Sequence, residues 1–116
     1  MIRRQRTLAT VYRGTPATAV DGNRYMSAFA AIASQVAVNI QEPTADRLLA
    51  VFGADFPGTA VAYALPDAIT EEDRLKITSG PFLGSQYLVT KRVRHRQGSR
   101  NDHDELGLVT TAETLP

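Results

Sequence analysis

The sequence contains no cysteine and no tryptophan, and aromatic residues make up only 7% of it. The absence of cysteine excludes disulfides and thiolate metal sites. The two histidines, His95 and His103, stand in a charged stretch and not at the spacing of metal ligands, so we expect neither a metal nor a cofactor. With so few aromatic side chains, the core has to rest on valine, leucine, isoleucine and alanine.

Neither sign of charge is in excess, because 13 lysines and arginines stand against 12 aspartates and glutamates, a net charge of +1. Such a balance is unlike that of a chain coated with nonspecific nucleic-acid contacts. No apolar run of signal-peptide or membrane-spanning length follows the basic residues 1–6. We therefore expect a protein that is made in the cytoplasm, that acts there or in an assembly built there, and that contacts no membrane.

Motifs of catalysis are missing as well. A nucleophile needs a neighbouring base, and the histidines fall near the tip of an expected hairpin, where solvent normally surrounds them. The acidic groups at 71–73 and 102–105 are typical of solvated corners and not of a general acid and base pair. No glycine-rich phosphate loop is present. We expect no catalytic residues, and hence no enzyme.

The sequence does contain short segments of alternating polarity, separated by turn residues. Thr44 is a suitable N-cap for a short helix that Gly53 ends. Six strands and one helix in a single domain of 116 residues predict a mainly β fold, a small and mostly antiparallel β-barrel that hides its edges. Residues 111–116 are expected to form a loose tail. The expected strands are 7–12, 36–41, 59–65, 74–77, 86–96 and 105–110, and the expected helix is 45–52.

Residues 13–35 do not fit this pattern, and we expect a long loop or an inserted segment there. Its part from Ala17 to Ser34 is rich in alanine, with Met26, Phe29 and Ile32 at every third position. One interpretation is a short amphipathic helix or strand that packs on the barrel. The other is a long functional loop with a mildly apolar tip. Both interpretations stay open at this point.

Two further patterns point to contact surfaces. Ala60, Ala62 and Ala64 share one face of an expected strand, so the helix or another subunit is expected to pack closely there. Positive residues gather along the strand 86–96 and the hairpin that follows it. They either keep the hairpin soluble, paired with Asp102, Asp104 and Glu105, or contact phosphates or an acidic partner. The positive residues are Lys91, Arg92, Arg94, Arg96 and Arg100.

The order of these pieces resembles that of the phage head–tail joining proteins, also called head-closure or stopper proteins. The resemblance covers about two thirds of the chain. It includes a strand that ends in Ile-Gln, a threonine-led helix, a strand with alternating small residues, a Gly-x-x-Tyr-x-Val strand and a charged hairpin. The matching segments are 38–41, 44–52, 59–63, 67–75, 84–89, 91–102 and 105–108.

The resemblance implies a homo-oligomeric ring in the neck of the virion, assembled in the host cytoplasm. Such a ring lies between the portal or its adaptor and the tail terminator or tail tube, closes the head, retains packaged DNA and provides the tail-docking surface. It implies a subunit seam for the three alanines and a contact with DNA or an acidic partner for the positive residues. A loop facing the channel or a neighbouring ring is implied for Asp21, Asn23, Arg24, Met26, Phe29 and Ile32.

Two other functions are compatible with the same sequence. A tail terminator is also a small, β-rich, ring-forming virion protein, but it caps the tail tube. A cytoplasmic nucleic-acid-binding β-barrel would bind free DNA as a monomer, in a salt-sensitive way.

Overall fold

The computed structural model describes residues 7–54, 56–58, 60–95, 102–112 and 115. It contains seven strands and one helix, as the sequence pattern predicts apart from one additional strand. The elements are β1 (Leu8–Thr18), β2 (Arg24–Ala37), β3 (Asn39–Gln41), α1 (Ala45–Phe52), β4 (Ala60–Ala64), β5 (Arg74–Ser79), β6 (Gln86–His95) and β7 (His103–Thr110).

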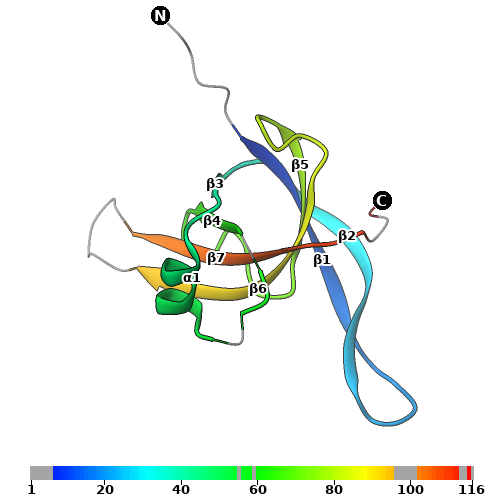
Figure 1. Cartoon of the computed structure of the whole chain (residues 1–116). Coiled ribbons are helices and arrows are strands. Elements are labelled where there is room, and N and C mark those ends of the chain that lie inside the picture. Colours follow the sequence, from blue (N-terminus) through cyan, green and yellow to red (C-terminus); the bar gives the residue numbers. More distant parts are fainter. Residues whose placement is uncertain (1–6, 55, 59, 96–101, 113–114, 116) are drawn as a thin grey trace, which may run out of the picture.

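All strands pair antiparallel in one curled sheet with the order β2-β1-β5-β6-β7-β4-β3, which confirms the mainly β fold with one short helix (Figure 1). The expected closed barrel needs a correction, because no ladder joins β2 to β3 within the described residues. Instead, the two edges of the sheet are joined by the chain itself, since only Val38 separates β2 from β3. The Val38 N–H donates to the carbonyl of Thr7 at 3.1 Å.

The core lies inside the curl of the sheet and is aliphatic, as the composition predicts. Leu75, Ile77, Leu106 and Leu108 point inward and are at most 1% exposed. Ile69, on the β4–β5 connection, is fully buried in the same cluster. The connection therefore closes one end of the core with an apolar side chain.

The three small residues of β4 belong to this core. Ala60, Ala62 and Ala64 are 4%, 0% and 6% exposed and belong to the buried cluster. Ala62 pairs with Leu106 and Ala60 with Leu108, so the small side chains leave room for the leucines of β7. The interpretation as a subunit seam is therefore wrong, because a seam needs side chains that another subunit can reach.

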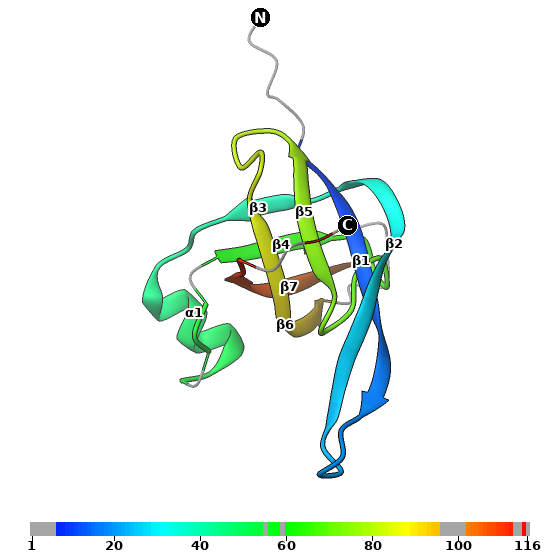
Figure 2. The same cartoon turned by 90° about the vertical axis from the view of Figure 1, so that its right-hand side faces the viewer.

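The segment expected to be a long loop forms most of a long hairpin. β1 continues to Thr18 and pairs with β2, and the end of this hairpin projects from the body in both views (Figures 1 and 2). Three register shifts interrupt the pairing, and Ala28 and Gln35 adopt positive φ angles of 53° and 54°. These are β-bulges, each of which adds a residue to β2 and increases its twist.

The bulges explain the period of three, which one interpretation assigned to a short amphipathic helix or strand. Met26 and Phe29 both lie next to Gly14, where an added Cβ would be 3.0 and 2.9 Å from their atoms. In a regular strand, side chains three residues apart point to opposite faces. The bulge at Ala28 brings these two to the same face, and glycine at position 14 leaves room for the ring of Phe29.

Helix α1 has the predicted boundaries, and the Thr44 hydroxyl accepts a hydrogen bond from the Arg47 N–H at 3.3 Å. Gly53, at φ 90°, follows its end. None of its residues is buried, and Leu49 is 54% exposed. The helix is thus a weakly covered element on the outside of the sheet. Among the described residues, no helix is both long and apolar enough to cross a membrane.

The end of the chain is attached to the body more firmly than a loose tail would be. The Thr111 N–H donates to the carbonyl of Gln86 at 3.1 Å, and Leu115 is 7% exposed. Residues 113, 114 and 116 of the expected tail lie outside the described part.

Candidate functional site

The hairpin is attached to the body by an ion pair whose carboxylate is buried and whose arginine is partly exposed. Arg13 lies where β1 leaves the sheet, and its Nε and Nη2 atoms each donate to Asp73 at 2.9 Å. Asp73 is 1% exposed and also accepts the Thr70 N–H at 2.9 Å. The hydrogen bonds to Asp73 raise the pKa of Arg13, whereas the partial burial of Arg13 acts to lower it. Such a two-pronged pair fixes direction as well as distance, so it sets the angle at which the hairpin leaves the body.

A second contact supports the same region. The guanidinium of Arg74 lies over the ring of Phe29, 4.5 Å from its centroid, which is cation–π geometry. Arg74 also donates to the carbonyl of Glu72 at 2.8 Å. Phe29 is therefore held at the base of the hairpin and does not belong to a free apolar tip.

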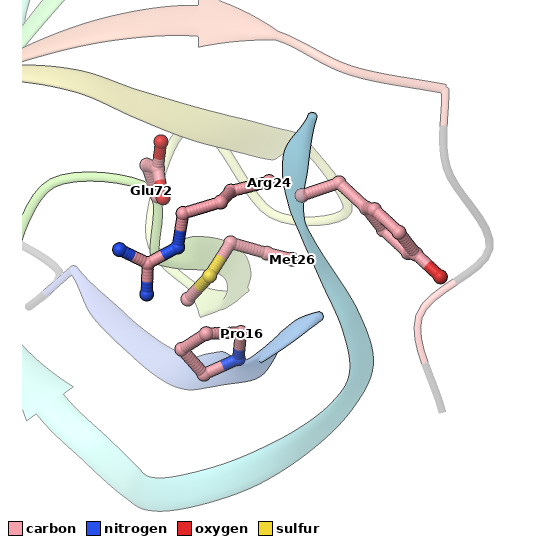
Figure 3. A pocket seen from close by; sticks show the side chains of 5 residues that line it. Pro16, Arg24, Met26 and Glu72 are labelled. Atoms are coloured by element: carbon pink, nitrogen blue, oxygen red, sulfur yellow. The ribbon is translucent and has the colours of Figure 1, made fainter. Parts of the chain in front are cut away.

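Beyond this base, the hairpin and the body enclose a hollow. Its first part, of about 410 Å³, is lined by Pro16, Arg24, Tyr25, Met26 and Glu72. Figure 3 shows Pro16, Arg24 and Met26 of the hairpin and Glu72 of the body around this space. A second part of about 370 Å³ shares three of these residues and continues along the body. The further residues that line it are Arg74, Leu88, Val89 and Thr90.

The tip of the hairpin is a tight turn, as the Asp-Gly-Asn sequence predicts. The Asp21 carboxylate accepts hydrogen bonds from both the backbone and the side-chain amide of Asn23, each at 3.0 Å. Gly22 has φ 89°. The six residues expected on one loop are thus divided among the tip (Asp21 and Asn23), the hollow (Arg24 and Met26), the base (Phe29) and the exposed Ile32.

The positive residues of β6 have two different positions. Lys91 pairs with Gly107 on the outer face, while Arg92 and Arg94 pair with Leu106 and Asp104. A register shift between Val89 and Lys91 moves the arginines onto the face of the core, a change that the regular alternation does not predict. Arg96 and Arg100 lie outside the described residues.

Arg94 is neutralised within the chain. Its Nε donates to Asp104 Oδ1 at 2.9 Å, and its Nη2 reaches the Asp67 carboxylate. Arg92 lies 3.8 Å from the same Asp67 carboxylate. The interpretation that acids pair with the arginines therefore holds for Arg94, and the side chain with most of its charge left for a partner on this strand is Lys91.

Asp104 is fully buried, and its surroundings decide its ionisation. Burial alone would raise its pKa, but the hydrogen bonds from Arg94 and the Asp67 N–H, together with the charges of Arg94 and Arg92, outweigh burial and lower the pKa. The hydrogen bonds that Arg94 donates to the carboxylates of Asp104 and Asp67 raise the pKa of Arg94. Asp104 is thus a carboxylate at neutral pH, and it connects β6, β7 and the β4–β5 connection.

The lowered pKa predicts a specific acid sensitivity. A carboxylate with a lowered folded-state pKa stabilises the protein fully above its unfolded value, about 4, and this stabilisation is lost as the pH falls through the folded value. Asp104→Asn is expected to be less stable than the original protein at pH 7, and its free energy of unfolding should change less below about pH 4. Urea unfolding followed by far-UV circular dichroism over a pH series measures both. Two curves that stay parallel down to acid pH would refute this role for Asp104.

A second buried carboxylate, Glu105, lies on the outer face under α1 and is 0% exposed. It accepts hydrogen bonds from Arg47 of α1 at 3.1 Å and from the Tyr63 hydroxyl of β4 at 3.2 Å. His95 Nε2 lies 2.8 Å from it, and His103 stacks on His95 with ring centroids 4.8 Å apart. The histidines expected to be solvated at a hairpin tip therefore belong to this packed polar cluster.

The expectation of solvated acidic corners is wrong for three residues, because Asp73, Asp104 and Glu105 are all buried. The alternation of side chains along a strand indicates part of this burial. Asp73 precedes the inward Leu75 and Ile77 in alternation, and Asp104 likewise precedes Leu106 and Leu108. In contrast, nothing in the sequence indicates that α1 covers Glu105.

No protein-family model matches this sequence, and no curated protein matches it significantly. Among solved structures, the solution structure of protein SF1141 from Shigella flexneri 2a is similar, with a TM-score of 0.59. The two chains are 12% identical, and the match covers 96% of this chain and 95% of that chain. At this identity the similarity shows that the two chains share a fold and carries no functional information.

Proposed function

We propose that this protein is a structural component of a phage neck. In this proposal it forms a homo-oligomeric ring between the portal or adaptor and the tail, closes the head, retains packaged DNA and provides the docking surface for the tail. The observation that carries the proposal is the β1–β2 hairpin. It projects from the body (Figure 2) and exposes Tyr25 and Ile32 by 51% and 48%.

Physical chemistry supports an assembly function for such a hairpin. A two-stranded ribbon in water is only marginally stable, and its strands gain stability from a third element that covers them. Apolar side chains exposed on a projecting element are typical of protein–protein contacts. The hairpin is thus suited to contact a neighbouring subunit, which agrees with the order of elements that resembles the joining proteins.

The state of the arginines favours a joining protein over a nucleic-acid-binding barrel. The charge of Arg94 is neutralised by Asp104 and Asp67, and Arg92 also lies near Asp67. A nonspecific DNA-binding surface needs cations that can replace counterions on phosphates. Of the positive residues predicted to contact packaged DNA in the channel, Lys91 is therefore the described one with most of its charge left, and Arg96 and Arg100 lie outside the described part.

The test is an amber mutation in the gene for this chain, in the phage whose genome carries it. In a host that cannot suppress the mutation, electron microscopy should show filled heads that lose DNA, beside complete tails that do not attach. Adding the purified protein should join them into infectious particles. Tails of irregular length beside stably closed heads would contradict the proposal and would instead identify a tail terminator.

A further inference from the structure

None of the described residues covers two exposed apolar surfaces of this chain, and these surfaces lie apart. One is the hollow between the β1–β2 hairpin and the body. The other is the outer face of α1, which contains no buried residue and exposes Leu49 by 54%. Figures 1 and 2 both show α1 and the free end of the hairpin on different sides of the body.

We infer that the hollow receives helix α1 of a second copy of this chain, so that copies join head to tail. This inference rests on the proposed function in that it names the seam of the proposed ring. A head-to-tail contact uses two different surfaces of each subunit, and it closes into a ring when the rotation between neighbours allows closure. Because the two surfaces do not overlap, each copy can use both at once.

The shapes and polarities of the two surfaces match. The hollow has apolar walls at Pro16, Met26 and Leu88, and amphipathic helices bind in such grooves with their apolar side chains inserted. The helix presents Leu49 on the same surface as the small residues Ala45 and Gly53. A two-turn helix with small residues around one leucine can approach the walls of the hollow closely.

The charges at the two surfaces are complementary. The hollow is lined by two arginines, Arg24 and Arg74, and by one acid, Glu72, so that its lining is positive on balance, and Arg24 is exposed. The start of α1 is acidic, because Asp46 lies in its first turn and Glu42 precedes it, both exposed. Opposite charges at the rim of a contact orient the partners and select against other pairings. With Leu49 in the hollow, the acidic start of the helix faces the rim that carries Arg24.

Sedimentation velocity on the full chain tests the two surfaces separately. Leu49→Glu is expected to raise the dissociation constant of self-association by about tenfold or more, as loss of a central apolar contact does. The matched control is Leu83→Glu, since Leu83 is 66% exposed on the β5–β6 connection, outside both surfaces. Equal effects of the two changes, or no effect of Leu49→Glu, would overturn the inference. Circular dichroism verifies that both variants fold.

A charge exchange tests the orientation. Arg24→Asp and Asp46→Arg should each weaken self-association, and the double variant should restore it to within about threefold of the original chain. A double variant that associates no better than either single variant would contradict the pairing. This outcome would leave the neck function itself unaffected, because the amber test measures the joining of heads to tails and not the geometry of the seam.

The absence of cysteine makes a crosslinking test unambiguous. A chain with both Pro16→Cys and Leu49→Cys, treated with a short bis-maleimide, should give a ladder of trimers and larger species on a denaturing gel. Either single variant should stay monomeric, and a mixture of the two should give only dimers. Efficient dimers of Leu49→Cys alone would show helix against helix, and dimers of Pro16→Cys alone hairpin against hairpin. Either result, or the absence of crosslinks in the double variant, would overturn the inference.

Discussion

Asp73→Ala is expected to lower the free energy of unfolding by about 2–4 kcal/mol and to detach the hairpin from the body. The change removes both carboxylate contacts of Arg13 and the acceptor of the Thr70 N–H. The loss is smaller than for a fully enclosed ion pair, because the Arg13 side chain is 39% exposed and can turn to water. Urea unfolding gives the energy, and amide hydrogen exchange of residues 13–37 measures the detachment.

The neighbouring residue supplies the control. Glu72 is exposed and has a positive φ of 70°, an angle that alanine would keep. Glu72→Ala should therefore change stability little and leave exchange in the hairpin unchanged. If the two variants behave alike, the carboxylate of Asp73 does not hold the hairpin.

Glu105→Ala is expected to cost about 2 kcal/mol and to release α1 from the sheet. Glu105 accepts hydrogen bonds from Arg47 of the helix and from Tyr63 of β4, and no residue of the helix is buried. A short helix depends on tertiary contacts, so the amides of 45–53 should exchange faster in the variant. Because the chain has no tryptophan, far-UV circular dichroism is the suitable probe of unfolding.

Glu42→Ala is the matched control for this second change, because Glu42 is an exposed acid near the same helix. It should leave both stability and exchange in α1 near those of the original chain. A Glu105 variant with unchanged exchange in α1 would mean that apolar contacts alone hold the helix. The tilted pair of Phe52 and Phe56, with centroids 4.8 Å apart, would then be the contact to test.

Sequence patterns predict correctly those elements that depend on neighbouring residues in the chain. Helix α1 was predictable residue by residue, because its cap at Thr44 and its glycine end at Gly53 depend on neighbours in the sequence. The inward leucines of β5 and β7 followed from simple alternation. In contrast, β2 was not predictable as one strand, because its bulges at Ala28 and Gln35 disrupt the period of two.

The site was less predictable than the fold, since it depends on pairs far apart in the chain. Arg13 and Asp73 are 60 residues apart, and Arg47 and Glu105 are 58 apart. A sequence shows which residues carry charge, but the strand order decides which of them meet. The register shift near Val89 likewise places Arg92 and Arg94 on the inner face of the sheet. Without this shift, the regular alternation of β6 would place the two arginines on the outer face.

The direct passage from β2 through Val38 into β3 has a mechanical consequence. Residues 24–41 run from the hairpin to the far edge of the sheet, and α1 begins at Ala45 soon after. A force applied to the hairpin is carried along this backbone toward the helix. The force pulls β2 along β1 in shear, so that many hydrogen bonds of the β1–β2 ladder share the load. Rigid elements of this kind transmit displacement between distant surfaces. In a head-to-tail ring, a pull on one subunit would therefore pass to the next through covalent bonds within each chain and one contact between chains.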